Sequence, residues 1–250
     1  MKHVRKSHPE PEPLGEYRAR FARAPKPPGW KDFTKDPRRR EPVKARLRDD
    51  QRGLCAYCEN RLTPEDESVE HFIPRSIAPE SELEWTNLLL CCGGGATRQT
   101  DVSTGEDSPF DAASRTCGHA KGAALGPILN PLELPVFPCL FRFTLEIGEI
   151  QPDPDSCLAG KVDSVLAEQT MTVLALRSGR LNRARLAVLN ELLAQLAADG
   201  AAPAFSVERA AEIAAQQLPA GGDLPAVFTT IRWFLGTATE ERLAAVAFEG

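Results

Sequence analysis

The chain has 250 residues, of which 42% are hydrophobic, enough to bury one substantial core or a compact core with a smaller satellite unit. The formal net charge of -5 is unevenly placed, because residues 1–62 contain 17 Lys and Arg against 9 Asp and Glu, while the remainder contains 13 against 26. No stretch approaches the roughly 20 apolar residues of a membrane helix, and no export signal opens the chain, so we expect a cytoplasmic protein without membrane contact.

Residues 1–42 form a basic segment that eight prolines interrupt, and these prolines disfavour a long helix. We predict an arm that docks through Trp30 and Phe33. Its positive charge is either a solvated surface or a phosphate-binding one. The pattern that follows, with Val43 and Leu47 on one face, predicts a helix over residues 41–50.

Cysteine spacing predicts a metal site further along the chain. Two thiolates separated by two residues can hold one tetrahedral zinc ion, as in Cys55-Ala-Tyr-Cys58, and Cys92 and Cys117 offer a second pair. Because the seven cysteines are odd in number and no export signal is present, metal ligation is favoured over disulfides. The alternative is that these cysteines are small buried apolar residues. Of Cys91 and Cys92 only one can face the ion, since strand neighbours point to opposite faces.

Short elements are predicted between and after the cysteine pairs. Residues 68–74 read as a strand that ends at a proline, and residues 84–90 as a second strand or extended turn. Residues 93–116 are rich in Gly, Ser, Asp and Thr and lack periodicity, so we predict an inserted surface loop. A short helix over 117–125 is expected to follow.

The rear of the chain is predicted to be mainly helical. A hairpin over residues 136–151, with Gly148 at its turn, comes first. Apolar stripes then predict helices over 180–198, 207–218 and 224–248. These helices are rich in alanine, and their sequence offers no evident chemistry.

The cysteines frame two of the four histidines in a specific order: Cys55-x-x-Cys58, Glu70-His71-Phe-Ile-Pro74, Asn87-Leu88 with Cys92 five residues after Asn87, and Cys117-Gly-His119-Ala-Lys121-Gly122. This order resembles the motif of HNH, or ββα-metal, endonucleases. Over residues 1 to about 200 the arrangement also resembles the PtuB family, the nuclease subunits of Septu-type and retron-associated antiphage systems.

The resemblance implies an α+β fold. It consists of a small ββα-metal HNH core with a zinc-knuckle site of four cysteines, a second short hairpin and a mainly helical C-terminal region. The implied division is a basic proline-rich arm over 1–42, a nuclease domain over 43–152 that carries the inserted loop 93–116, and a helical region over 160–250.

The resemblance also implies roles for the residues of the motif. His71 is the general base that removes a proton from water, and Asn87 holds its ring by a side-chain or backbone hydrogen bond. Glu70 and His119 ligate one Mg²⁺ or Mn²⁺ ion, which stabilises charge on the phosphate and helps the 3′ oxygen to leave. The zinc ion of the four cysteines is structural.

Lys121 and Arg75 are candidate contacts to nucleic-acid phosphate, with a solvated surface as the equal alternative. The chain contains no phosphate-binding loop for ATP. The resemblance therefore implies a separate ABC- or SMC-like ATPase subunit, PtuA-like, as partner, and DNA as substrate. Two alternatives remain open: the same site cleaves RNA such as tRNA, or the chain is a non-catalytic zinc module that binds nucleic acid or protein.

Overall fold

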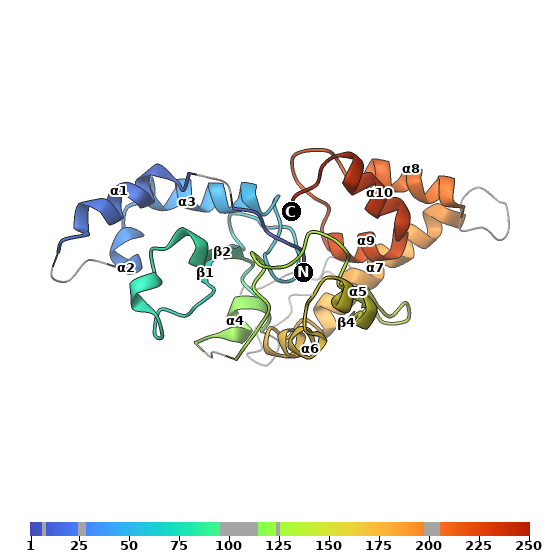
Figure 1. Ribbon diagram of the computed structural model, residues 1–250, viewed down its shortest axis with the longest axis horizontal. Coiled ribbons are helices and arrows are strands. Elements are labelled where there is room, and N and C mark those ends of the chain that lie inside the picture. The colour runs from blue at the N-terminus through green and yellow to red at the C-terminus, as the bar shows by residue number, and fades with distance from the viewer. Residues whose placement is uncertain (7–8, 25–28, 96–114, 124–125, 198–205) are drawn as a thin grey trace.

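The computed structural model describes residues 1–6, 9–24, 29–95, 115–123, 126–197 and 206–250. Figure 1 shows an elongated molecule in which helices α1 to α3 and the sheet β1–β2 lie at one end, while helices α7 to α10 lie at the other. Helix α4 lies between them. In the described residues, helices combine with two small antiparallel sheets, which gives the mixed α+β architecture that the sequence predicts.

The described part of residues 1–42 is largely helical. It contains α1 and α2 and leads into α3, which begins four residues before the predicted helix (Glu12–Phe21, Trp30–Phe33 and Pro37–Asp50). Pro13 and Pro37 stand in the first turns of α1 and α3, where a missing N–H costs no intrahelical hydrogen bond. Trp30 and Phe33 are buried in the main hydrophobic core. The prolines thus start helices here, while the proposed division of the chain at residue 42 remains a prediction.

The first sheet is an antiparallel hairpin of β1 (Ser68–His71) and β2 (Leu88–Cys91). Its register sets Glu70 opposite Leu89 and His71 opposite Leu88. The connection contains two short 3-10 helices (Pro79–Ser81 and Trp85–Asn87), so the predicted second strand begins only after the second of them. All four residues of β2 are buried, which fixes the hairpin against the core.

Helix α4 (Cys117–Lys121) follows the predicted inserted loop, of which residues 96–114 lie outside the described part of the chain. The backbone N–H of Cys117 donates to the carbonyl of Leu174 at 2.8 Å, so the start of α4 is tied to the C-terminal region. A five-residue helix is too short to be stable alone. Its position therefore depends on these tertiary contacts.

The second predicted hairpin is present, as β3 (Phe141–Phe143) and β4 (Ile150–Pro152). Gly148 in its turn has φ of 69°, and a β-carbon there would overlap the backbone of α7. The helices that follow are α5 to α10 (Pro154–Ala159, Ser164–Val173, Gly179–Ala197, Val207–Gln217, Phe228–Leu235 and Thr237–Ala245). Helix α7 matches the predicted helix closely, whereas α5 and α6 had no counterpart in the sequence prediction.

The predicted helix over 224–248 is wrong, because Gly236 divides it into α9 and α10. Gly236 has φ of 55° and its N–H closes the last turn of α9. Among the described residues, the buried apolar side chains form two clusters. One joins the N-terminal helices, the first sheet, the second hairpin and α6, and the other lies mainly among α7 to α10. No helix in the described ranges combines the length and apolar character needed to cross a membrane.

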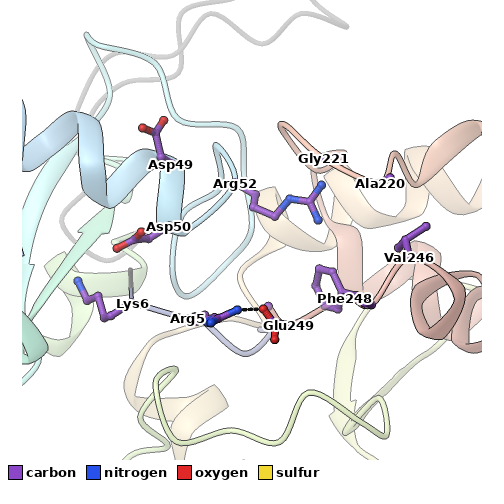
Figure 2. A pocket seen from close by; sticks show the side chains of 12 residues that line it. Arg5, Lys6, Asp49, Asp50, Arg52, Ala220, Gly221, Val246, Phe248 and Glu249 are labelled. Atoms are coloured by element: carbon purple, nitrogen blue, oxygen red, sulfur yellow. Dashed lines mark ion pairs between the residues drawn. The ribbon is translucent and has the colours of Figure 1, made fainter. Parts of the chain in front are cut away.

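A cavity of about 540 Å³ lies where the end of α3, the N-terminal segment and the C-terminal segment meet (Figure 2). Arg5, Asp49 and Arg52 line it, and the Arg5 guanidinium pairs with the Glu249 carboxylate across its mouth. Charges of both signs therefore face this space. None of the motif residues lines it.

Candidate metal centre and catalytic site

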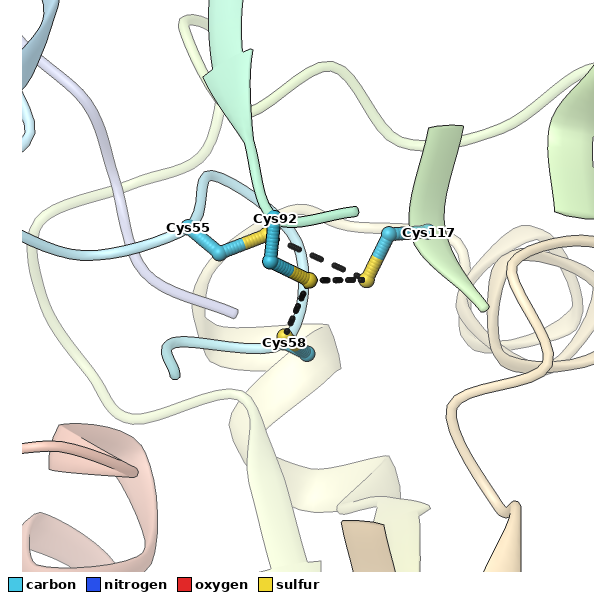
Figure 3. A group of neighbouring side chains, drawn as sticks. All are labelled: Cys55, Cys58, Cys92 and Cys117. Carbon is cyan, nitrogen blue, oxygen red and sulfur yellow. Dashed lines mark hydrogen bonds between the residues drawn. The ribbon is translucent and has the colours of Figure 1, made fainter. Parts of the chain in front are cut away.

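Four cysteine sulfurs converge from three segments of the chain (Figure 3). Cys55 and Cys58 lie in the turn after α3, Cys92 directly follows β2, and Cys117 is the first residue of α4. Each of the four is at most 4% exposed. The structure thus brings together the two cysteine pairs that the sequence predicts, although 25 residues separate Cys92 from Cys117.

The spacing of the sulfurs fits one tetrahedral ion. The Sγ atoms of Cys55 and Cys117 are 3.8 Å apart, those of Cys58 and Cys92 3.6 Å, and those of Cys92 and Cys117 3.8 Å. All four lie within 4.8 Å of one another. Metal–sulfur bonds of about 2.3 Å in a tetrahedron require sulfur separations of about 3.8 Å. Cys91 ends β2 opposite Ser68 and is outside this group.

The ring of His71 is held at the end of β1. Its Nε2 lies 3.0 Å from the backbone carbonyl of Glu82, and Trp30 packs edge to face against it at 5.2 Å between ring centroids. A carbonyl can only accept, so Nε2 carries the proton and Nδ1 keeps its lone pair. Burial of the ring lowers the pKa of His71 to about 4, which keeps it neutral at pH 7. A neutral imidazole with an unprotonated Nδ1 is able to accept a proton from water.

Asn87 holds a loop rather than the ring of His71. Its Oδ1 accepts from the Ile73 N–H at 2.7 Å, and its Nδ2 donates to the carbonyls of Ile73 and Ser81 at 3.1 and 3.0 Å. These bonds tie Ile73 and Ser81, both in the connection after β1, to Asn87. Glu82, which contacts the ring, directly follows Ser81. The predicted direct contact between Asn87 and His71 is thus corrected to an indirect one.

Glu70 lies against the backbone of α4. A β-carbon at Gly118 would come within 2.6 Å of the Glu70 Oε2, so the glycine allows this close approach. Its Oε1 is buried and forms an ion pair with the Lys121 ammonium, 2.5 Å away. His119 is the next residue of α4 and is exposed. A carboxylate on β1 and an exposed imidazole on α4 are ligand types that suit a divalent ion.

Lys121 is an internal cation whose ammonium faces protein partners, and its predicted contact with phosphate stays a prediction. Its side chain is 2% exposed, and its Nζ donates to the carbonyls of His71 and Phe72 at 2.6 and 2.8 Å. With Glu70 as third partner, the three N–H donors of the ammonium are used. Arg75 is exposed on the connection after β1, and its contact with phosphate remains a prediction.

Two residues that hold the His71 ring were not found from the sequence. Glu82 acts through its backbone carbonyl, so the identity of its side chain gives no signal. Trp30 lies 41 positions before His71, and its sequence signal was only that of a large aromatic residue in a polar segment. Both contacts depend on how the N-terminal helices fold back onto the hairpin.

No family model matches the chain. A protein of Escherichia coli with the description "Retron Ec83 putative HNH endonuclease" is 33% identical over 172 residues, which is 59% of this chain. The matched stretch covers 64% of that relative, which is less than two thirds of its length. The description of this relative names the same family that the order of motif residues in the sequence resembles.

Proposed function

We propose that the chain is a metal-dependent HNH endonuclease that hydrolyses phosphodiester bonds of DNA. The observation that carries this proposal is the buried His71, whose Nε2 is bonded to a carbonyl and whose neighbour Glu70 lies against the backbone of α4. General-base catalysis requires a proton acceptor in a fixed orientation beside a site of charge stabilisation. The E. coli relative provides independent support.

The residues of the site have distinct tasks in this proposal. His71 Nδ1 takes the proton of the attacking water. Glu70 and His119 would hold Mg²⁺ or Mn²⁺, an ion that, when bound, supplies positive charge for the phosphate oxygens and the leaving 3′ oxygen. Lys121 keeps the Glu70 carboxylate and the end of β1 in place. Asn87 orders the loop whose carbonyl holds the His71 ring.

The four cysteines are proposed to bind a structural zinc ion. Their buried, tetrahedral arrangement leaves no position for a substrate, as expected of a closed site. Cys92 and Cys117 flank the segment between β2 and α4. Zinc bound there would join the hairpin that carries Glu70 to the helix that carries His119.

DNA is the proposed substrate, and the charge distribution supports a nucleic-acid partner. The first 62 residues hold 17 basic against 9 acidic residues, and part of this excess lies on α3, where the Arg38 side chain is 91% exposed. The helical C-terminal region, which includes α7 to α10, is proposed to dock a PtuA-like ATPase subunit in an antiphage complex. Co-purification with a neighbouring ATPase tests that part separately.

The substrate is tested by incubating the full chain with supercoiled DNA and with RNA, in Mg²⁺, in Mn²⁺ and in EDTA. The proposal predicts cleavage of DNA that requires a divalent ion and stops in EDTA. Cleavage of RNA alone would replace the substrate but keep the enzyme. Failure to cut either polymer, alone and with the partner, would contradict the proposed function.

A further inference from the structure

We propose that Trp30 is a positioning residue for His71, and that the N-terminal helical segment is therefore part of the catalytic centre. This inference rests on the proposed function, because it concerns the orientation of the same general base. The N-terminal segment contacts the His71 ring directly, through Trp30. It also contacts the loop whose Glu82 carbonyl binds the same ring.

The direct contact is aromatic. The rings of Trp30 and His71 cross at 84° with centroids 5.2 Å apart, a geometry in which the positive edge of one ring meets the negative face of the other. The Glu82 hydrogen bond fixes only the Nε2 atom of the imidazole, so the ring plane could still tilt about the line from Cβ to Nε2. The Trp30 contact sets the plane of the ring, and hence the direction of the Nδ1 lone pair.

Trp30 is itself held rigidly. Its side chain stacks on Phe33 with centroids 5.5 Å apart and planes 25° apart, and Phe33 is completely buried. Tyr17 of α1 packs against Phe33 at 5.2 Å, and the Arg39 guanidinium of α3 lies 4.7 Å from the centre of the Tyr17 ring. All three N-terminal helices thus contribute to the position of one indole.

The same segment also supports the Glu82 loop. Gly29, the residue before Trp30, lies so close to the Glu82 carboxylate that any β-carbon there would overlap it. Arg18 of α1 donates to the Glu84 carboxylate at 2.7 Å, two residues further on. The two groups that hold the His71 ring are the Trp30 indole and the Glu82 carbonyl. Both depend on contacts of the N-terminal segment, which contains no residue of the motif.

The kinetic consequence follows from the sensitivity of proton transfer to orientation. A small misplacement of a catalytic group can cost about 100-fold in rate. Loss of the Trp30 ring should therefore lower kcat, because the Nδ1 lone pair is no longer aimed at the water. Binding of DNA should change little, since the indole is 8% exposed and cannot form a broad contact with the substrate.

The experiment compares Trp30→Leu and Trp30→Phe with wild type, with Trp233→Leu as the matched control. Trp233 packs against Phe143 in the second hairpin, so its exchange removes the same ring without touching His71. For each protein, kcat, KM for DNA, the melting temperature and the NMR signal of the His71 ring C–H are measured. The His71→Ala spectrum assigns that signal among the four histidines.

We expect Trp30→Leu to lower kcat about 10- to 100-fold with KM within about 3-fold of wild type, and Trp30→Phe to recover most of the rate. The His71 signal should shift in Trp30→Leu, because the ring current of the indole is lost, and stay in place in Trp233→Leu. Equal kcat in wild type and Trp30→Leu, or a loss no greater than in Trp233→Leu, would overturn the inference. If wild type itself does not cleave, the proposed function fails. In that case the NMR signal alone tests the contact, and a His71 signal that does not shift in Trp30→Leu would reject it.

Discussion

Cys92 and Cys91 provide a matched pair of substitutions at the proposed zinc site. Both side chains are 1% exposed, but only the sulfur of Cys92 lies in the group of four. Cys92→Ser removes one ligand, whereas Cys91→Ser makes the same chemical change on the neighbouring residue. The two variants should therefore differ in metal content even though the substituted residues are adjacent in the chain.

The size of the effect follows from the site. Structural zinc contributes roughly 10–16 kcal/mol in small zinc units, so loss of one thiolate in four should cost at least ~3 kcal/mol. For chains of this size 1 kcal/mol shifts Tm by about 2–4 °C, which predicts a fall of about 6–12 °C for Cys92→Ser. Cys91→Ser buries a hydroxyl, at a cost of roughly 1–3 kcal/mol, and keeps the ion.

Elemental analysis of purified protein, together with thermal unfolding, measures both quantities. One equivalent of zinc per chain is expected for wild type and Cys91→Ser, and much less for Cys92→Ser. Metal content is the decisive readout, because the melting temperatures of the two variants can overlap. A Cys92→Ser protein that retained one equivalent and melted like wild type would refute the four-cysteine site, as would loss of the ion from Cys91→Ser alone.

Three further substitutions separate stability from activity. Gly118→Ala should push the Glu70 carboxylate away from α4 and lower the cleavage rate about 10- to 100-fold. The melting temperature should change little, because the displaced group is the flexible end of a side chain. An unchanged rate would argue against Glu70 as a ligand. Lys121→Met removes the partner of two carbonyls and a buried carboxylate oxygen, and should reduce the free energy of unfolding by about 3 kcal/mol. The salt dependence of DNA binding should not change. A shallower salt dependence would support the predicted contact between Lys121 and phosphate. Gly148→Ala, at φ of 69° against the backbone of α7, should cost roughly 2–4 kcal/mol in chemical denaturation without altering the rate per folded molecule, and a stable variant would show that the hairpin turn can shift.

The sequence predicted the parts of the site that depend on local spacing. The cysteine knuckle, the hairpin around Glu70 and His71, and the short helix at Cys117 all follow from residues close to one another in the chain. It could not predict which atoms hold the His71 ring, because the Glu82 carbonyl and the Trp30 edge are brought there by tertiary packing. The same holds for Lys121, whose burial depends on how α4 packs against β1.

Other errors arose from signals that were present but misread. Prolines in residues 1–42 were taken as breaks, although those in first turns are compatible with helices. The aspartates before α5 and α6 are N-caps, since Asp153 accepts from the Ser156 N–H and Asp163 from the Val165 N–H, each at 2.8 Å. The apolar pattern over 224–248 continues across Gly236, so the sequence was read as one helix although this glycine separates α9 from α10.

The central claim is that His71 is the proton acceptor of a nuclease. Its most direct test is the single-turnover cleavage rate of supercoiled DNA in Mg²⁺ or Mn²⁺ for wild type and His71→Ala, with zinc content and melting temperature determined on the same preparations. General-base catalysis predicts a loss of about 100-fold or more, with zinc retained and folding intact. Equal rates in the two proteins would contradict the claim, and absence of cleavage in both, with normal zinc content, would favour a non-catalytic zinc module.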